Sequence, residues 1–410
     1  MKNSYDFVII GARSAGSVLA NPLRAKGQNS VLILEAGRND KALNIQIPAQ
    51  FSKLYKTKFD YDYTTSPQKN MKNRELYLPR GKTLGGSSSI NAMIYIRGSK
   101  HDYNEWNTLG NEGWSYDEVL PYFKKSENQE VINDQYHNRG GPLNVTNRIY
   151  TNPLSDVFVQ AAQELGYKFN SDFNGTKQEG FGLYQVTHKD GTRCSAARAY
   201  LHPASKRKNL TIEANAQVER IVIEDNCVTG VIYHQKGKAC EVVVNKEVIL
   251  SAGAYNSPQI LMLSGIGDGQ ELQKHRIPVK EHLPGVGKNL RDHPMLYVAW
   301  EPRSDYENPK TNYSRVSMSL RYTSKNSSFN NDMIIYMNSS TKNNGNPEVP
   351  DGIKANLTLN LEESAGEVFL NDKDPRKYPR LFYNYLDTEN DINRFVEGIS
   401  ILEDIGTVSY

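Results

Sequence analysis

The sequence predicts an α/β protein that combines a strand–turn–helix–strand unit at its amino end with an antiparallel sheet further along the chain. The apolar run 7–10 stops at Gly11, and a helical pattern and a second apolar run, 31–34, follow it. Short β-rich runs separated by polar turns occupy 210–254, and alternating strands follow His293. A chain of 410 residues is long enough for two domains.

The turn after the first strand is typical of a dinucleotide-binding site. A tight turn that leads into a helix points several backbone N–H groups at one spot, which suits a pyrophosphate. Glu35 closes the second apolar run, where its carboxylate can accept the hydroxyls of an adenosine ribose. The alternative for this segment is a buried strand–helix unit that binds no ligand.

The glycine pattern of this turn departs from G-x-G-x-x-G at its second glycine. Arg13 stands where a glycine would let the main chain approach the phosphates. Its guanidinium could instead lie over the anion and assist binding, but charge does not restore clearance, so weakened binding is favoured. The candidate residues of the turn are Gly11, Arg13, Ser14, Ala15 and Gly16.

The nearly balanced charge of the chain argues against a nucleic-acid partner. Lys and Arg number 49 and Asp and Glu 46, which leaves a net charge of +3. The longest apolar stretches are strand-sized, so no transmembrane segment is predicted, and residues 1–3 lead directly into the first strand. We therefore expect a cytoplasmic protein, or one at the periphery of the inner membrane. Cys194, Cys227 and Cys240 lack metal-ligand spacing, so no metal site is predicted.

Several further elements follow from local patterns. A helix is predicted over Trp106–Lys125, with Ser115 three residues before Glu118 in a capping-box arrangement. Residues 38–78 lose periodicity and are interpreted as a lid, because long irregular excursions in compact proteins are usually functional. Further predicted elements are a helical stretch over 157–165, strands over 296–301, 315–322 and 332–337, and a helix over 389–404.

The segment 78–91 is the densest cluster of small residues in the chain. Gly85 and Gly86, followed by three serines, give a backbone that can pass very close to a flat ligand; a Gly/Ser linker is the alternative. Residues 79–98, PRGKTLGGSSSINAMIYIRG, resemble the first signature of the glucose–methanol–choline (GMC) family of FAD-dependent oxidoreductases. Residues 253–267, GAYNSPQILMLSGIG, resemble the second signature of that family, and 283–294, LPGVGKNLRDHP, resemble the segment that follows it.

This resemblance implies a Rossmann-type FAD-binding domain and an α+β substrate domain built on an antiparallel sheet. The FAD-binding domain is expected over 1–125 and 210–295, and the substrate domain over 126–209 and 296–410. FAD is expected to be non-covalent, because Ile90 precedes Asn91 where some relatives attach FAD to a histidine. The backbone of Val218 is expected to meet the adenine, although an inward strand valine fits equally. The cofactor-binding residues implied by the signatures are Gly85, Gly86, Ser87, Asn91, Ala92, Met93, Val218, Ala252 and Gly253.

The resemblance also implies a function. A choline dehydrogenase-like member oxidises a primary alcohol, choline-like or other, to the aldehyde by hydride transfer to flavin N5. Relatives carry their active-site histidine in a segment after the position of Tyr410, so no catalytic residue is assigned here, and His293 is interpreted as structural. The alternative is a truncated, catalytically impaired remnant that binds FAD weakly or not at all. An NAD-dependent dehydrogenase is disfavoured, because that class requires neither signature. The sequence identifies neither the alcohol, nor the electron acceptor, nor the oligomeric state.

Overall fold

The computed structural model describes residues 4–21, 29–147, 153–301, 316–325, 327–338 and 352–407. The chain divides into two compact units, each assembled from three stretches. Unit 1 comprises Met1–Asn91, Arg193–Arg291 and Ala365–Tyr385. Unit 2 comprises Ala92–Thr192, Asp292–Ser364 and Leu386–Tyr410.

These divisions differ from the domain boundaries after residues 125, 209 and 295 that the sequence predicted, and those boundaries stay a prediction. The helical region 100–126 belongs to unit 2. In contrast, Ala197, Leu201 and Ala204 lie in unit 1, because they pack in the same buried cluster as the first strands. Each unit therefore collects segments that are distant in sequence but share a core.

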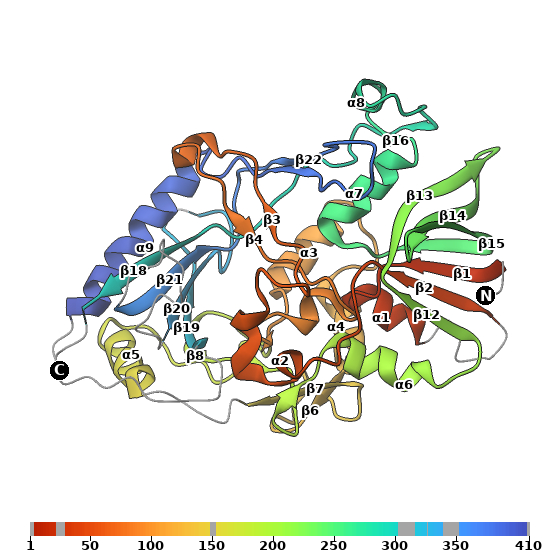
Figure 1. Ribbon diagram of the computed structural model, residues 1–410. Helices are drawn as coiled ribbons and strands as arrows, with labels where there is room; N and C mark the ends of the chain where they lie inside the picture. Colours follow the sequence, from red (N-terminus) through yellow and green to blue (C-terminus); the bar gives the residue numbers. More distant parts are fainter. Residues whose placement is uncertain are drawn as a thin grey trace. The chain divides into compact units, whose positions relative to one another are not determined.

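The main sheet of unit 1 has the strand order β12-β2-β1-β15-β14-β13 (Figure 1). Strand β1 (Ser4–Ile10) pairs in parallel with β2 (Val31–Glu35) on one side and with β15 (Lys238–Leu250) on the other. Side chains of β1 are buried on both faces of the sheet, which explains its continuous apolar run. The short β-rich runs predicted over 210–254 are confirmed as β12–β15, and the last of them joins this sheet beside β1.

The remaining elements of unit 1 include β12, β13 and β14, the other three strands of this sheet. They are α1 (Ser14–Ala20), α2 (Leu43–Gln46), η2 (Pro48–Leu54), β3 (Tyr63–Thr64), η3 (Lys69–Met71), β4 (Tyr77–Leu78), η4 (Gly86–Ser89), η5 (Ala197–Leu201), α6 (His202–Ser205), β12 (Leu210–Ala214), β13 (Ala216–Glu224), β14 (Cys227–Gln235), α7 (Gly253–Leu263), β16 (Ile266–Gly267), α8 (Gly269–Lys274), β17 (Glu281–His282), β22 (Glu367–Phe369) and β23 (Arg380–Phe382).

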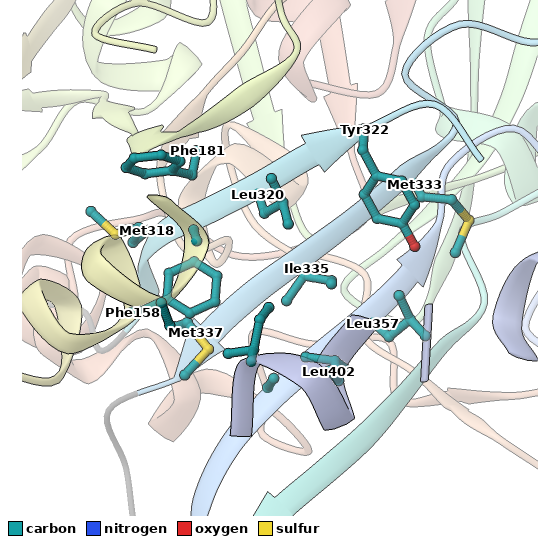
Figure 2. Close-up of a cluster of buried hydrophobic side chains, with 14 of the residues drawn as sticks. Phe158, Phe181, Met318, Leu320, Tyr322, Met333, Ile335, Met337, Leu357 and Leu402 are labelled. Atoms are coloured by element: carbon teal, nitrogen blue, oxygen red, sulfur yellow. The ribbon is translucent and has the colours of Figure 1, made fainter. Parts of the chain in front are cut away.

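Unit 2 is built on an antiparallel sheet with the strand order β18-β21-β20-β19-β8. One face of the sheet packs against α5 and α9 in an apolar core that includes Phe158, Leu320, Ile335, Leu357 and Leu402 (Figure 2). The sheet and the helix over 389–404 were predicted and are confirmed. Arg315, the first residue of one predicted strand, lies outside the described residues.

The elements of unit 2 are β5 (Ile94–Tyr95), α3 (Lys100–Thr108), α4 (Tyr116–Ser126), β6 (Glu127–Gln129), β7 (Leu143–Asn147), α5 (Pro153–Glu164), β8 (Gly180–Leu183), β9 (Gln185–Val186), β10 (His188–Lys189), β18 (Met295–Trp300), β19 (Val316–Tyr322), β20 (Met333–Asn338), β21 (Ile353–Leu359) and α9 (Glu389–Thr407). The short strand β11 (Thr192–Arg193) crosses the division between the units.

The single helix predicted over Trp106–Lys125 is wrong, because two helices, α3 and α4, occupy this region. Gly110 and Gly113 have φ values of +98° and +84°, in the left-handed region that ends a right-handed helix. The predicted capping box is confirmed at the start of α4, where the backbone N–H of Ser115 donates to Glu118 Oε2 at 3.1 Å. Within the described part of the chain, no helix is both long and apolar enough to cross a membrane.

A buried charge network in unit 2 joins Glu127, at the start of β6, to the loops that carry Arg97 and His137. Arg97 Nη2 donates to Glu127 Oε2 at 2.9 Å. The ring of His137 lies between two carboxylates, with Nδ1 3.0 Å from Glu127 Oε1 and Nε2 2.9 Å from Asp172 Oδ2. Asp134 lies close by, and Asp134, His137 and Asp172 each present one ligand atom within 4.8 Å of those of the other two. Since both ring nitrogens of His137 face carboxylate oxygens, the arrangement is that of an imidazolium donating to both.

Candidate functional site

The turn after β1 lies where the carboxyl ends of three strands meet. Gly11 N donates to Leu34 O at 2.8 Å, and Ser251 N donates to Ile10 O at 2.8 Å. Gly11 has φ +97°, and a Cβ there would lie 2.6 Å from Ser251 O, so only glycine fits. The turn is therefore tight because the end of β15 passes directly beside it.

The amino end of α1 follows this turn. Arg13 is its N-cap residue, and Ser14 and Ala15 in its first turn are exposed. Gly16 packs on the turn, because a Cβ there would lie 2.0 Å from Gly11 O. The predicted geometry of turn and helix is thus present, and the first turn of α1 is open on its outer side.

The first signature is tied to this turn through its main chain. Gly85 N donates to Ala12 O at 2.7 Å. Gly85 and Gly86 have φ values of +84° and +55°, which explains why glycines stand at both positions. Ser87 Oγ accepts from Gly81 N at 3.1 Å, and Asn91 Oδ1 accepts from Arg193 Nη1 at 2.9 Å, so both side chains support the loop.

The second signature reaches the same place from the carboxyl end of β15. Ala252 is the N-cap residue of α7, and Gly253 begins that helix with φ +83°. A Cβ on Gly253 would lie 2.6 Å from Arg13 Nη1, and a Cβ on Gly86 would lie 2.6 Å from Arg13 Cγ. The dinucleotide turn and the two signatures therefore converge on the side chain of Arg13.

Arg13 is held in this position by a polar and an aromatic contact. Its Nη2 donates to Asn256 Oδ1 at 3.0 Å, an oxygen that also accepts from Tyr63 OH at 2.9 Å. The guanidinium lies 5.1 Å from the ring centroid of Tyr61, which stacks on Tyr63. Asn256, Tyr61 and Tyr63 were not among the predicted site residues. The position of Asn256 inside the second signature was the one sequence signal that could have indicated it.

Glu35 is buried at the end of β2 and anchored by two backbone donors. Ala12 N donates to Oε2 at 3.0 Å and Gly37 N donates to Oε1 at 2.7 Å. Burial raises the pKa of the Glu35 carboxyl, and the charge of Arg13 and these two N–H groups oppose that rise. Each carboxylate oxygen retains further capacity to accept a hydrogen bond, as a ribose ligand requires.

Replacing Glu35 with alanine is expected to weaken FAD binding by about 1.5–3 kcal/mol, because a charged acceptor for ribose hydroxyls is lost. Titration of FAD followed by flavin fluorescence quenching measures this change. Glu35→Gln is the matched control, because it keeps the size and one acceptor oxygen and should lose less affinity than Glu35→Ala. Equal affinity of wild type and Glu35→Ala would contradict the ribose role.

The remaining predicted residues fall into two groups. Val218 lies on β13 with its side chain buried in the core of unit 1, so the strand-valine interpretation accounts for the side chain, and a backbone contact to adenine stays a prediction. Ala92 and Met93 belong to unit 2, where Met93 O accepts from Thr187 N at 2.9 Å. Their predicted role toward the cofactor also stays a prediction.

A sheet in which β12, β2, β1 and β15 run parallel, with a glycine turn, an open helix amino end and an acidic strand end, defines a dinucleotide-binding α/β protein of the Rossmann type. Within that class, the sequence matches the family model described as GMC oxidoreductase over residues 5–295. The chain belongs to the GMC oxidoreductase family, which makes it an FAD-dependent oxidoreductase of the class that acts on CH–OH donors.

Curated relatives match over almost the whole chain. The oxygen-dependent choline dehydrogenase of Rhizobium johnstonii is 39% identical over 98% of this chain and 77% of its own length. The mitochondrial choline dehydrogenase of Mus musculus is 38% identical over 98% of this chain and 73% of its own length. Among solved structures, pyridoxine 4-oxidase from Mesorbium loti superposes with a TM-score of 0.91 at 28% identity, covering 98% of this chain and 80% of that one.

The residues of unit 1 fit FAD with one exception. Glu35, the exposed first turn of α1 and the glycines at 86 and 253 would provide the acceptor, the N–H groups and the clearance that a dinucleotide needs. The exception is Arg13, because its side chain lies against Gly86 and Gly253, where clearance would otherwise exist. A flavin at these glycines requires this side chain to rotate away.

Proposed function

We propose that this protein binds FAD non-covalently and oxidises a primary alcohol to the aldehyde, with the hydride passing to flavin N5. The observation that carries the proposal is the convergence of the dinucleotide turn and both signature glycines, Gly86 and Gly253, at one place. The names of the Rhizobium and mouse relatives and of pyridoxine 4-oxidase support an alcohol substrate. When bound, FAD supplies the hydride acceptor, which no protein side chain can provide.

The residues of this chain would hold the cofactor without a covalent bond. Glu35 would accept the ribose hydroxyls, the first turn of α1 would face the pyrophosphate, and the Gly85-Gly86 loop would let the main chain approach the ligand. Ile90 next to Asn91 offers no nucleophile for a covalent flavin bond. No residue is assigned as proton acceptor; His293, whose lowered pKa favours the neutral ring, is the first histidine to test.

A second candidate function is a flavin-binding protein of impaired activity. The placement of Arg13 against Gly86 and Gly253 favours it, because the side chain takes up clearance that the cofactor needs. In this alternative the chain keeps the fold of the family and binds FAD weakly or not at all.

A spectrum of the purified chain after incubation with FAD distinguishes these functions. A yellow protein whose flavin absorption bleaches under an alcohol without oxygen supports the oxidoreductase, and reoxidation by oxygen or by a dye identifies the acceptor. Acid precipitation should leave the flavin in the supernatant. A protein that stays colourless at high FAD concentration would contradict the proposed function and support the impaired alternative.

A further inference from the structure

The antiparallel sheet of unit 2 has a second face, opposite its apolar core, that carries polar side chains. Ser319 on β19 lies opposite Tyr336 on β20, which lies opposite Asn356 on β21. In the next row, Arg321 lies opposite Ile334, which lies opposite Thr358. Because residues directly opposite each other share a face, Ser319, Arg321, Tyr336, Asn356 and Thr358 form one surface, which we call the polar face.

Arg321 on the polar face is a buried cation for which the described residues supply no counter-charge. It is only 5% exposed, its Nε has no hydrogen-bond partner, and it makes no ion pair with any residue that the structure describes. A buried charge is normally paired, since leaving water without a partner is costly. Arg394, which is also buried in unit 2, shows the usual solution, because it pairs with both Asp332 and Asp391.

The neighbours of Arg321 on the polar face share this lack of partners. Ser319 Oγ, Asn356 Oδ1 and Thr358 Oγ1 are buried, and within the described part of the chain none has a hydrogen-bond partner. Native proteins leave few buried polar atoms unsatisfied, and each one calls for an explanation. Four such atoms on one face of a sheet indicate that a ligand supplies the missing partners.

The charge of the polar face selects the kind of ligand. The described strand positions on this face are Met295, Tyr297, Ala299, Ser319, Arg321, Ile334, Tyr336, Lys354, Asn356, Thr358, Gly180 and Gly182, and none is Asp or Glu. The pKa of His293 is lowered chiefly by desolvation. The negative charge of Asp292 opposes this shift, and the positive charge of Arg321 adds to it. The surroundings of Arg321 therefore attract an anion and repel a cation.

The exposed positions beside the polar face lie on the edge strand β18. Tyr297 lies opposite Asn356 and Met295 lies opposite Thr358, and these two β18 side chains are 37% and 44% exposed. Asn356 and Thr358, which carry unsatisfied atoms, lie beside them on β21. Arg321 lies two strands further in.

We propose that the polar face binds the carboxylate of the alcohol substrate, so that the protein acts on a small hydroxy acid and not on a cationic alcohol such as choline. This inference rests on the proposed function, since it names the substrate class of that reaction. The guanidinium of Arg321 presents paired N–H donors that match a carboxylate, and the hydroxyl of Ser319, two residues away on the same strand, donates to the same group. The bound anion neutralises a charge that has no ion-pair partner among the described residues.

Calorimetric titration of the full chain with three alcohols of equal length tests the proposal. These are 3-hydroxypropanoate, 1,3-propanediol and 3-amino-1-propanol, which differ mainly in charge. We expect the anion to bind at least about tenfold more tightly than the neutral diol, in keeping with a charged pair, and the cation to bind most weakly. Equal or tighter binding of the diol or the amine would overturn the proposal. A preference for 2-hydroxyethyl phosphate over 3-hydroxypropanoate would overturn the assignment to a carboxylate.

The variant Arg321→Met separates a binding role from a structural one. Anion affinity should fall to that of the diol, while the melting temperature stays equal or rises, because an unpaired buried charge is replaced by an apolar side chain of similar length. Arg376→Met, which removes an exposed arginine paired with Asp374, is the control and should leave anion affinity unchanged. Anion binding retained in Arg321→Met, or lost in Arg376→Met, would contradict the site. Anion binding without flavin reduction by any alcohol would overturn the proposed oxidation and leave the anion site in place.

Discussion

Replacing Arg13 with glycine is expected to raise the affinity of the chain for FAD by about ten- to a hundredfold. The bound cofactor must displace the Arg13 side chain from Gly86 and Gly253, which requires its 3.0 Å hydrogen bond to Asn256 to break. A hydrogen bond to a charged group contributes about 1.5–3 kcal/mol, and every 1.4 kcal/mol corresponds to about a factor of ten. Glycine removes this cost and restores the clearance of the G-x-G-x-x-G turn.

Titration of FAD by fluorescence quenching measures the affinity, and two matched variants identify the cause. Arg13→Met keeps the bulk of the stem but removes the charge, so it should gain less than Arg13→Gly if clearance decides. Asn256→Ala keeps Arg13 but releases its guanidinium, so it should show an intermediate gain. The melting temperature of each apoprotein confirms that the variants fold. Weaker binding by both Arg13→Gly and Arg13→Met would show that Arg13 is a phosphate ligand, and the occlusion argument would then be wrong.

Stability is expected to fall as the pH rises from 6.5 towards 9, because His137 loses the proton that joins Glu127 to Asp172. Burial by itself lowers the pKa of His137, but the hydrogen bonds to Asp172 and Glu127 outweigh it and raise the pKa from 6.5 to about 9. Because the folded pKa of His137 lies above the unfolded one, between pH 6.5 and about 9 the native state holds a proton that the unfolded state has lost. The contribution is complete below pH 6.5 and is lost as the pH passes 9, with a slope of at most about 1.4 kcal/mol per pH unit for one proton.

Urea unfolding at a series of pH values from 6 to 9.5 measures the change of the unfolding free energy with pH. We expect a slope close to the limit for one proton. The variant His137→Gln should be less stable than wild type at pH 6 and should lack the added slope, because glutamine does not titrate. His188→Gln replaces another buried histidine of unit 2, leaves the His137 network intact and should keep the wild-type slope. Identical slopes for wild type and His137→Gln would contradict an imidazolium between the two carboxylates. A strong stabilisation by zinc at pH 7 would instead indicate that His137, Asp134 and Asp172 bind a metal.

The sequence was sufficient for features that depend on residues close together in the chain. Continuous apolar runs predicted β1 and β2, alternating strands predicted the antiparallel sheet, and the spacing of Ser115 and Glu118 predicted the start of α4. These patterns are reliable because backbone preference and side-chain period act over a few residues. The prediction of one helix over 106–125 failed where the local signal was present but unused, since Gly110 and Gly113 already indicated a break.

The tertiary structure alone decided what each distinctive side chain contacts. Arg13 is an irregular residue of a glycine motif in the sequence, and only the folded chain brings it to Asn256, 243 positions away. Arg321 is an ordinary strand residue in the sequence, and its lack of a partner emerges only when the neighbouring strands are aligned beside it. The physical reason is that burial and charge pairing are set by residues distant in sequence. The sequence by itself therefore determined the family and the position of the dinucleotide turn, while packing determined that Arg13 lies against the signature glycines and that Arg321 is left to bind an anion.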